Sequence, residues 1–268
     1  MSVKVYIEAI GAIGPGANNW PEWRSILRKE VAYQPARTVN PVLNVLPSAE
    51  RRRVGIGVKI ALASGLEALA AAGIDPSSMT TVFCSSGGDG ENCHLICEAL
   101  ASSDRMISPT RFHNSVHNAP SGYWGIASGA MLPSTSLCAY DAGFAVGLLE
   151  AAVQCSVEKR PVLLVVYDTP YPEPIHGVRP VADQFAISIL LTPDVTQGSI
   201  TAIDVSLEKT PSTTMESSEL ENVRVGIPAA RGLPLMQVLA QLPEQAAAAD
   251  IYLEYVNQQS LRVKFVAA

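Results

Sequence analysis

The chain has 268 residues, 48% of them hydrophobic, so it is long enough to bury a substantial core without disulfide bridges. Its 19 Lys and Arg residues against 25 Asp and Glu residues give a net charge of −6. This balance argues against nucleic acid as a partner, because phosphate binding needs a concentrated basic face. The longest basic run is Arg51 to Arg53. We interpret it as the solvated start of a helix, the alternative being a patch for an acidic partner.

Targeting and metal-binding signals are weak. No stretch reaches the ~18 apolar residues of a membrane span, and the N-terminal sequence lacks the basic region and unbroken apolar core of a signal peptide. Five cysteines without framework spacing indicate reduced thiols and a cytoplasmic protein. Cys93, His94 and Cys97 have no second ligand pair at zinc spacing. We therefore interpret the two cysteines as buried thiols and expect neither a metal nor a cofactor.

The first third of the chain begins with a predicted strand, followed by a long excursion and a helix. Residues 3–10 alternate polar and apolar, which is typical of a strand. Residues 11–47 are rich in Gly, Pro and Asn, with a short helix expected around residues 22–28. From residue 49 to 72 the apolar pattern is helical throughout, and Gly73 is a natural stop.

A second strand is predicted to run into a Gly-rich turn over Thr80 to Gly90, with a helix at residues 91–101. The turn lacks the Lys-Ser/Thr pair of a P-loop and the spacing of the dinucleotide fingerprint. We interpret its glycines as relief of backbone crowding at a strand end rather than as a phosphate cradle.

The segment from Ser108 to Ser134 is the most unusual of the sequence. His113 and His117 are spaced i and i+4 and are followed by Tyr123 and Trp124. On a helix this spacing would place both imidazoles on one face, as in a metal pair, but no Glu or third His stands at metalloprotease spacing. We interpret the segment as helix-end packing or as an interface.

Residues 133–153 predict a strand, a tight turn and a buried helix, with Asp141 at the turn. Such a turn places its residue at a helix N-terminus, where the backbone dipole favours negative charge and can activate a thiol. A carboxylate stands where a nucleophile would be expected. We interpret its present role as a cap of the following helix.

The remainder predicts further strands and one helix. Strands are expected at residues 160–169, 184–192, 200–208, 251–256 and 261–266, and a helix at residues 233–242. The Ser/Thr-rich stretch at 209–221 is predicted to be a mobile linker. Strands alternating with helices indicate an α/β layer structure with a buried sheet.

Taken in this order, the elements resemble a condensing enzyme of the thiolase fold, specifically the ketosynthases that elongate acyl chains on acyl carrier protein. The sequence CSSGGDG resembles the Gly-Ser-Gly loop of that family, and YVNQQSLRVKF its closing turn and last strand. Asn118, Gly122, Gly129 and Pro133 fall where the family has Asn, Gly, Gly and Pro.

Counting on from Pro133 without a gap, the active cysteine of the family's Thr-Ala-Cys motif falls on Asp141. The same register brings VVYDT, Val165 to Thr169, onto the strand that ends in Gly-Gly-Thr-Glu, which argues against using Cys138 instead. The resemblance is good over about residues 80–205.

The resemblance implies an α/β, thiolase-like fold, layered α-β-α-β-α, with a shortened C-terminal half. Residues 1–208 would form the N-terminal ketosynthase-like half, with its dimer helix and a degenerate nucleophile turn. Residues 222–268 would be a reduced remnant of the C-terminal half, within a single globular unit.

The family's catalytic groups are missing from this sequence. Claisen condensation needs a thiolate and two histidines or a close substitute, yet no His-Gly-Thr or Gly-His motif occurs, and the four histidines at 94, 113, 117 and 176 all precede the region where the catalytic pair would lie. We expect no condensing activity from this chain alone.

Inactive ketosynthase relatives are known as chain length factors, and this chain resembles the truncated group in aryl polyene-type gene clusters. The resemblance implies a heterodimer with a full-length ketosynthase, formed across the helix-and-strand face that active enzymes use to homodimerise. Acyl carrier protein would interact through that complex. A higher assembly, such as a dimer of heterodimers, is left open.

In this family the dimer-helix segment lines the far end of the partner's acyl tunnel, and a bulky side chain there would stop elongation by excluding volume. The candidate tunnel and interface residues are Phe112, His113, Val116, His117, Asn118, Tyr123 and Trp124. An ordinary dimer core is the alternative reading of these aromatics.

Two further functions remain open. One is an independent thiolase-fold enzyme, acting in acyl transfer or condensation, that uses Cys138 or Cys84 with His113 or His117. The other is a purely structural ketosynthase subunit.

Overall fold

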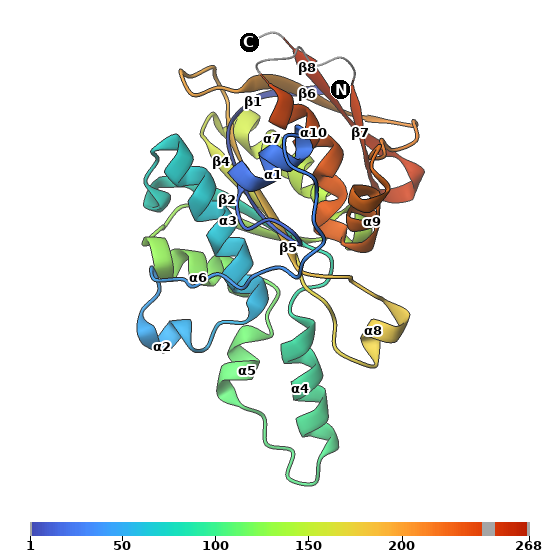
Figure 1. Cartoon of the computed structure of the whole chain (residues 1–268). Coiled ribbons are helices and arrows are strands. Elements are labelled where there is room, and N and C mark those ends of the chain that lie inside the picture. Colours follow the sequence, from blue (N-terminus) through green and yellow to red (C-terminus); the bar gives the residue numbers. More distant parts are fainter. Residues whose placement is uncertain (1, 243–249, 267–268) are drawn as a thin grey trace.

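The computed structural model describes residues 2–242 and 250–266. Its strands form one eight-stranded sheet in the order β3-β2-β4-β5-β1-β6-β8-β7 (Figure 1). Their bounds are β1 Ser2–Ile13, β2 Thr80–Ser85, β3 Ser134–Cys138, β4 Val162–Asp168, β5 Phe185–Thr192, β6 Thr201–Glu208, β7 Ile251–Glu254 and β8 Ser260–Val266. The described strands thus make one β layer, which the C-terminal strands β7 and β8 extend.

The sheet is mixed. Strand β2 pairs in parallel with β3 and β4, whereas β5, β1, β6, β8 and β7 pair antiparallel with their neighbours. Every residue of β2, β4 and β5 is buried. Near-continuous apolar strands such as β4 and β5 are stable only when helices cover both faces of a sheet. The predicted strands at these positions are confirmed.

Helices cover both faces of the sheet. Their bounds are α1 Trp20–Leu27, α2 Ser48–Arg51, α3 Ile56–Ala72, α4 Gly90–Ala101, α5 Pro109–Asn114, α6 Ala119–Ser128, α7 Gly143–Glu158, α8 Ile175–Val178, α9 Ser218–Gly226 and α10 Leu233–Gln241. Short 3-10 turns are η1 Pro76–Ser78, η2 Tyr140–Ala142, η3 Pro228–Gly232 and η4 Val256–Gln258. Helices α7, α1 and α10 pack in one hydrophobic cluster, and α3 and α6 in a second.

The helix predicted at residues 49–72 is interrupted. A short α2 ends at Arg51, and α3 begins only at Ile56 after an extended Gly55. A Cβ at Gly55 would lie 2.7 Å from the Asp89 carboxylate, so the chain passes this point closely and a helix does not continue through it. The predicted stop is confirmed, because Gly73 ends α3 with a left-handed φ of 68°.

The stretch predicted as a mobile linker, residues 209–221, is instead tied to the body of the protein. The Thr213 N–H donates to the Tyr252 carbonyl at 2.7 Å, and Met215 is buried in the core. Helix α9 begins at Ser218, whose preceding residue Ser217 caps it. The linker prediction is wrong because Ser and Thr here serve as hydrogen-bonding and capping residues.

Helices α4 and α5 pack on each other and project away from the sheet (Figure 1). We call residues 90–114 the α4–α5 hairpin. Within α4 only Gly90 and Asn92 are buried, so the hairpin contributes little to the core. None of the helices in the described ranges has the length and apolar character needed to cross a membrane.

Candidate functional site

The predicted strand, turn and buried helix are confirmed at the position singled out in the sequence. Strand β3 ends at Cys138, η2 covers Tyr140–Ala142, and α7 follows. Tyr140 has a φ of +52°, a left-handed conformation that non-glycine residues seldom adopt and that concentrates at functional sites. The turn therefore keeps the sharp geometry of a site that presents a side chain.

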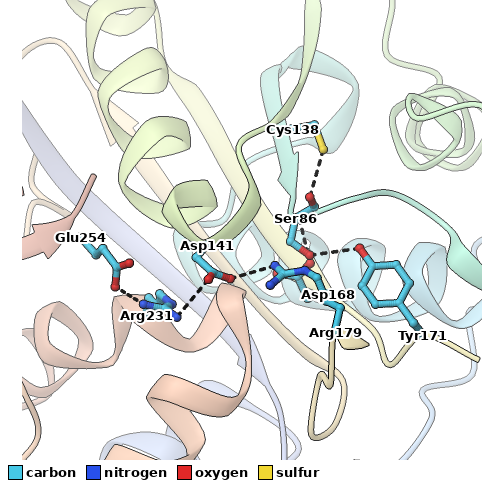
Figure 2. Close-up of polar contacts among 8 residues, drawn as sticks. All are labelled: Ser86, Cys138, Asp141, Asp168, Tyr171, Arg179, Arg231 and Glu254. Atoms are coloured by element: carbon cyan, nitrogen blue, oxygen red, sulfur yellow. Dashed lines mark hydrogen bonds and ion pairs between the residues drawn. The ribbon is translucent and has the colours of Figure 1, made fainter. Parts of the chain in front are cut away.

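Asp141, on this turn, is held between two guanidinium groups (Figure 2). Arg179 Nη2 donates to Asp141 Oδ1 at 2.8 Å, and Arg231 Nη2 lies 3.4 Å from Asp141 Oδ2. The side chains of Asp141, Arg179 and Arg231 are 29%, 17% and 14% exposed, respectively. Helix α7 has no side-chain cap. The prediction that Asp141 mainly caps this helix is wrong, since its oxygens face the arginines.

The ion pairs continue on both sides of Asp141. Arg231 also pairs with Glu254 on β7, and the Arg179 guanidinium stacks over the Tyr140 ring at 3.4 Å from its centroid. Two cations and two carboxylates balance one another in this cluster. Each oxygen of Asp141 thus has a guanidinium partner within the chain.

Asp168 lies fully buried at the end of β4, beside this cluster. The Ser86 N–H donates to Asp168 Oδ1 at 2.8 Å. Burial raises the pKa of Asp168 to about 6, against the opposing effect of the Ser86 and Ala229 hydrogen bonds and of Arg179. Asp168 thus joins β4 to the Gly-rich turn and to η3.

The Gly-rich turn after β2 accommodates Tyr171 (Figure 2). A Cβ on Gly87 would lie 2.1 Å from the Tyr171 hydroxyl, and one on Gly90 would lie 2.3 Å from the Tyr171 ring. The Tyr171 hydroxyl is 3.5 Å from Ser86 Oγ. The prediction of crowding at this strand end is confirmed, and the crowding group is a tyrosine from the β4–β5 loop.

The two thiols nearest the turn are poor nucleophiles. Cys84 is buried, which raises its pKa to about 12. Burial also raises the pKa of Cys138, whose thiol donates to the Ser86 carbonyl at 3.2 Å. Reactive thiols have lowered pKa values, so this environment disfavours the alternative that either cysteine acts with a histidine.

The cysteines of α4 differ from expectation. Cys93 and Cys97 are exposed rather than buried, because α4 projects from the body and has no core to cover it. His94 pairs with Glu98 at 3.3 Å. Within residues 2–242 and 250–266, no group of three or more His, Cys, Asp and Glu side chains is placed to hold a metal ion.

The predicted tunnel and interface residues divide into two groups. Phe112 is 66% exposed, and His113, Val116 and Asn118 are also exposed on α5 and the turn that follows it. His117 lies in that turn, outside α5 and α6, and its Nε2 is 2.7 Å from the Leu137 carbonyl. The two histidines therefore do not share a helical face.

The second group lies in the core of the chain. Tyr123 and Trp124 are each 2% exposed. The Tyr123 hydroxyl donates to Asn114 Oδ1 at 2.9 Å, while Trp124 packs edge-on against Phe83. The His113 ring meets Tyr123 in a T-shaped contact. The spacing of these residues in the sequence did not indicate that Tyr123 and Trp124 would be buried while Phe112 is exposed.

Several residues of the site were not identified from the sequence: Asp168, Tyr171, Arg179, Arg231 and Glu254. Asp168 stands at the end of an apolar run, which is a usable signal, since a charged residue at the end of a buried strand usually has a partner. The arginines carry no such signal because they lie in separate segments far from Asp141.

Comparison with known proteins places this geometry in context. Residues 20–249 match the family of the beta-ketoacyl synthase, N-terminal domain. No curated protein matches the chain by sequence.

Three solved structures resemble the fold. A chain of the ketosynthase (ApeO) in complex with its chain length factor (ApeC) from Xenorhabdus doucetiae is 22% identical, with a TM-score of 0.73, and the match covers 97% of this chain and 99% of that one. A chain of the AntDE:AntF complex, a type II polyketide acyl carrier protein with its ketosynthase, is 12% identical, with a TM-score of 0.76 and full coverage of both chains.

The third is the ketosynthase from module 1 of the bacillaene synthase of Bacillus amyloliquefaciens. It is 12% identical with a TM-score of 0.57, and the match covers 79% of this chain but 47% of that one. The predicted thiolase-like α/β fold is confirmed by these matches. This chain has nearly the length of the chains that it matches in the first two complexes, whereas its match spans only about half of the module ketosynthase.

Proposed function

The chain belongs to the family of beta-ketoacyl synthase N-terminal domains, and on that premise we propose that it is a non-catalytic chain length factor. It pairs with an active beta-ketoacyl-ACP synthase and helps to form and limit the acyl tunnel of that partner, in fatty acid or polyketide biosynthesis of the aryl polyene type. The end-to-end match to chains from ketosynthase complexes, one of which is named for its chain length factor, supports this assignment.

The proposal rests on the residue at position 141, which is an aspartate, and on the contacts of its side chain. A condensing enzyme needs a thiolate there to hold the growing chain as a thioester. Asp141 instead sits between Arg179 and Arg231. A carboxylate could at best form a mixed anhydride, which water would hydrolyse.

The histidines do not replace the missing ones. His94, His113 and His117 lie on or beside the α4–α5 hairpin, and His176 is on α8. Enolate and oxyanion stabilisation needs donors aimed at the reacting carbonyl next to the nucleophile. The groups that meet Asp141 are guanidiniums, and both are already paired with carboxylates of this chain.

The face proposed to meet the partner combines an edge strand and exposed apolar side chains. β3 stands at the end of the sheet and, among the described residues, pairs only with β2, so its outer edge is open to another strand. Exposed apolar residues lie on α5, in the turn after it, on α6 and in the segment before β3: Phe112, Val116, Ile126, Met131 and Leu132. An open strand edge and exposed apolar side chains are both features of interfaces.

The burial of the candidate side chains indicates which of them could limit the chain length of the product. Tyr123 and Trp124 support this face from behind, because they are already enclosed in the chain's own core. Phe112 is the large aromatic that remains exposed on α5. We assign the tunnel floor to Phe112, with His113, Val116, His117 and Asn118 as its neighbours at the interface.

The same proposal covers the organisation of the chain. Residues 1–208 are the ketosynthase-like half, and residues 222–268, which include the second part of α9 and all of α10, β7 and β8, are the remnant of a second half. Acyl carrier protein acts through the heterodimer. We also propose a cytoplasmic location, which the five free cysteines support.

The test is co-expression of the full chain with a complete ketosynthase that carries the Cys and two His. Co-purification as a stable heterodimer, with products whose length changes when this subunit is altered, is the expected result. A stable heterodimer whose products never change would reduce the role to that of a structural subunit.

Catalytic inactivity is tested separately. The purified, partner-free chain and its Asp141→Cys variant should both fail to form carbon–carbon bonds from acyl and extender thioesters. Condensation by either protein, or labelling of Cys84 or Cys138 by an acyl-thioester mimic, would favour the independent enzyme instead.

A further inference from the structure

Cys93 and Cys97 form a pair of thiols on α4 that the proposed chain-length function does not use. They stand four residues apart in a helix of 12 residues, a spacing that places both side chains on one face with Cβ atoms about 5–6 Å apart. Both are exposed. Neither sulfur has a hydrogen-bond partner within residues 2–242 and 250–266.

The three other cysteines are covered or engaged. Cys84 and Cys155 are buried. Cys138 is exposed, but its thiol donates to the Ser86 carbonyl at 3.2 Å. Among the five cysteines, Cys93 and Cys97 are therefore the two that present unengaged sulfurs to solvent, and they do so side by side.

The helical spacing disfavours a disulfide between these two thiols. A disulfide needs Cβ atoms about 3.5–4.5 Å apart, so α4 would have to distort by about 1 Å or more to form one. Partial burial, the Asp89 carboxylate and Cys97 raise the pKa of Cys93, which reduces the thiolate that an oxidant attacks. The influence of Cys97 on Cys93 also places the two sulfurs within electrostatic reach of each other.

A bridging metal ion suits the same spacing without distortion of the helix. Metal–thiolate bonds of about 2.3 Å place the two sulfurs of a linear sulfur–metal–sulfur unit about 4.6 Å apart. Cβ atoms about 5–6 Å apart can hold such a unit, because each sulfur extends from its own Cβ toward the other side chain.

The number of ligands selects the ion. Zinc in proteins takes four ligands, and no group of three or more His, Cys, Asp and Glu side chains is placed to hold a metal in the described part of the chain. His94 follows Cys93 directly, so its side chain is rotated by about 100° round the helix, and it pairs with Glu98 at 3.3 Å. Soft thiolates select Cu(I), an ion that two thiolates suffice to bind in linear geometry.

We propose that Cys93 and Cys97 together bind one Cu(I) ion on the exposed face of α4. The ion forms one bond to each sulfur and replaces both thiol protons, which pass to solvent, without a change of oxidation state. Helix α4 projects from the body of the protein (Figure 1) and buries only Gly90 and Asn92. The site is therefore open to Cu(I) delivered by exchange from another thiol.

The test is anaerobic titration of the full chain, or of its complex with the ketosynthase, with Cu(I) at pH 7.5 in competition with a chromophoric Cu(I) chelator. One Cu(I) per chain and a two-coordinate copper–sulfur signature in X-ray absorption are expected. Zn(II) should bind at least about a hundredfold more weakly, because it lacks two of its four ligands. Failure to bind Cu(I) against the chelator, or equal affinity for Zn(II), would overturn the site.

Single substitutions locate the ion. Cys93→Ser and Cys97→Ser should each weaken Cu(I) binding at least about a hundredfold, since one thiolate is lost. The circular dichroism spectrum should stay unchanged, because both side chains are exposed. Cys138→Ser, which removes the other exposed thiol, should bind Cu(I) like wild type. A loss confined to Cys138→Ser would place the ion at the turn after β3 and refute the assignment.

A spacing variant separates a built pair from any two surface thiols. Cys97→Ser combined with Leu100→Cys keeps two exposed thiols on the same face, but they lie about 10.5 Å apart along the helix axis, too far for one ion. This variant should lose 1:1 binding. Binding as tight as in wild type would contradict the proposal.

Alkylation provides a second readout. Cu(I) should protect Cys93 and Cys97, but not Cys138, from iodoacetamide, as mapped by mass spectrometry of peptides. Equal protection of all three thiols would show unspecific binding and count against the site. None of these measurements depends on product chain length, so they succeed or fail independently of the chain-length function.

Discussion

Arg179 Nη2 lies 2.8 Å from Asp141 Oδ1, although 38 residues separate the two in the chain. The arginine comes from the β4–β5 loop, which also supplies Tyr171. This loop therefore contacts the Asp141 turn through Arg179 and the Gly-rich turn after β2 through Tyr171.

Removing the charge of Asp141 should destabilise the protein. Asp141→Asn removes the carboxylate that pairs with both Arg179 and Arg231, and leaves Glu254 as the partner of Arg231. Removing one member of a largely buried ion pair typically costs about 3 kcal/mol of unfolding free energy. Urea denaturation at pH 7.5 measures the change. Glu216→Gln, which breaks the exposed pair with Lys29, is the control and should have no measurable effect. Equal stability of Asp141→Asn and wild type would show that the cluster is not stabilising.

Stability should fall with rising pH because of Asp168. Its pKa in the folded protein, about 6, is above the usual value of 3.8 for an Asp side chain in water. The folded state therefore binds the proton more tightly. The resulting stabilisation is complete below pH ~4 and is lost as the pH rises through 6, amounting to roughly 3 kcal/mol. Unfolding of Asp168→Asn and wild type across this range measures it.

In that comparison the variant should gain stability relative to wild type between pH 4 and pH 7. Asp75→Asn is a suitable control, because hydrogen bonds from Ser77 lower the pKa of Asp75 and it cannot produce this slope. A difference between Asp168→Asn and wild type that stays constant with pH would contradict the assignment.

Because Gly87 contacts Tyr171, a substitution of Tyr171 should restore the stability that a substitution of Gly87 loses. Gly87→Ala places a Cβ 2.1 Å from the Tyr171 hydroxyl and should cost about 1–3 kcal/mol through overpacking. Tyr171→Phe removes that oxygen, and the next ring atom is 3.2 Å away, so the double variant should recover most of the loss. A double-mutant cycle by thermal unfolding measures the coupling. Gly122→Ala, which has nothing within 4 Å, is the matched control.

Phe112 and Trp124 should respond differently to truncation. Phe112→Ala removes an exposed side chain, so stability should hold while the reconstituted heterodimer makes longer products. Trp124→Ala empties a core position and should cost about 3–5 kcal/mol. Mass spectrometry of the products and thermal unfolding give the two readouts. Unchanged products from Phe112→Ala, with Val178→Ala on α8 as the exposed control, would remove the tunnel-floor assignment.

Local patterns in the sequence predicted those parts of the fold that depend on local forces. Alternating and continuous apolar runs located the strands, Gly73 ended its helix, and the register from Pro133 placed Asp141 on the turn between β3 and α7. Each of these follows from the spacing of residues along one element.

What escaped prediction depends on contacts between distant segments. Nothing near Asp141 in the sequence indicates that Arg179 and Arg231 would reach it, so a capping role was assigned instead. Cys93 and Cys97 were expected to be buried, but exposure depends on where α4 lies relative to the body. The break before Ile56 likewise follows from the approach of Asp89 to Gly55.

The α4–α5 hairpin has a kinetic consequence. Because α4 buries only Gly90 and Asn92, local opening of the hairpin should need far less free energy than global unfolding. Its backbone amides should exchange with deuterium much faster than those of α3 or α7, which lie in the core clusters. If the hairpin belongs to the partner face, binding of the ketosynthase will slow that exchange, and amide protection will report assembly before any product is formed.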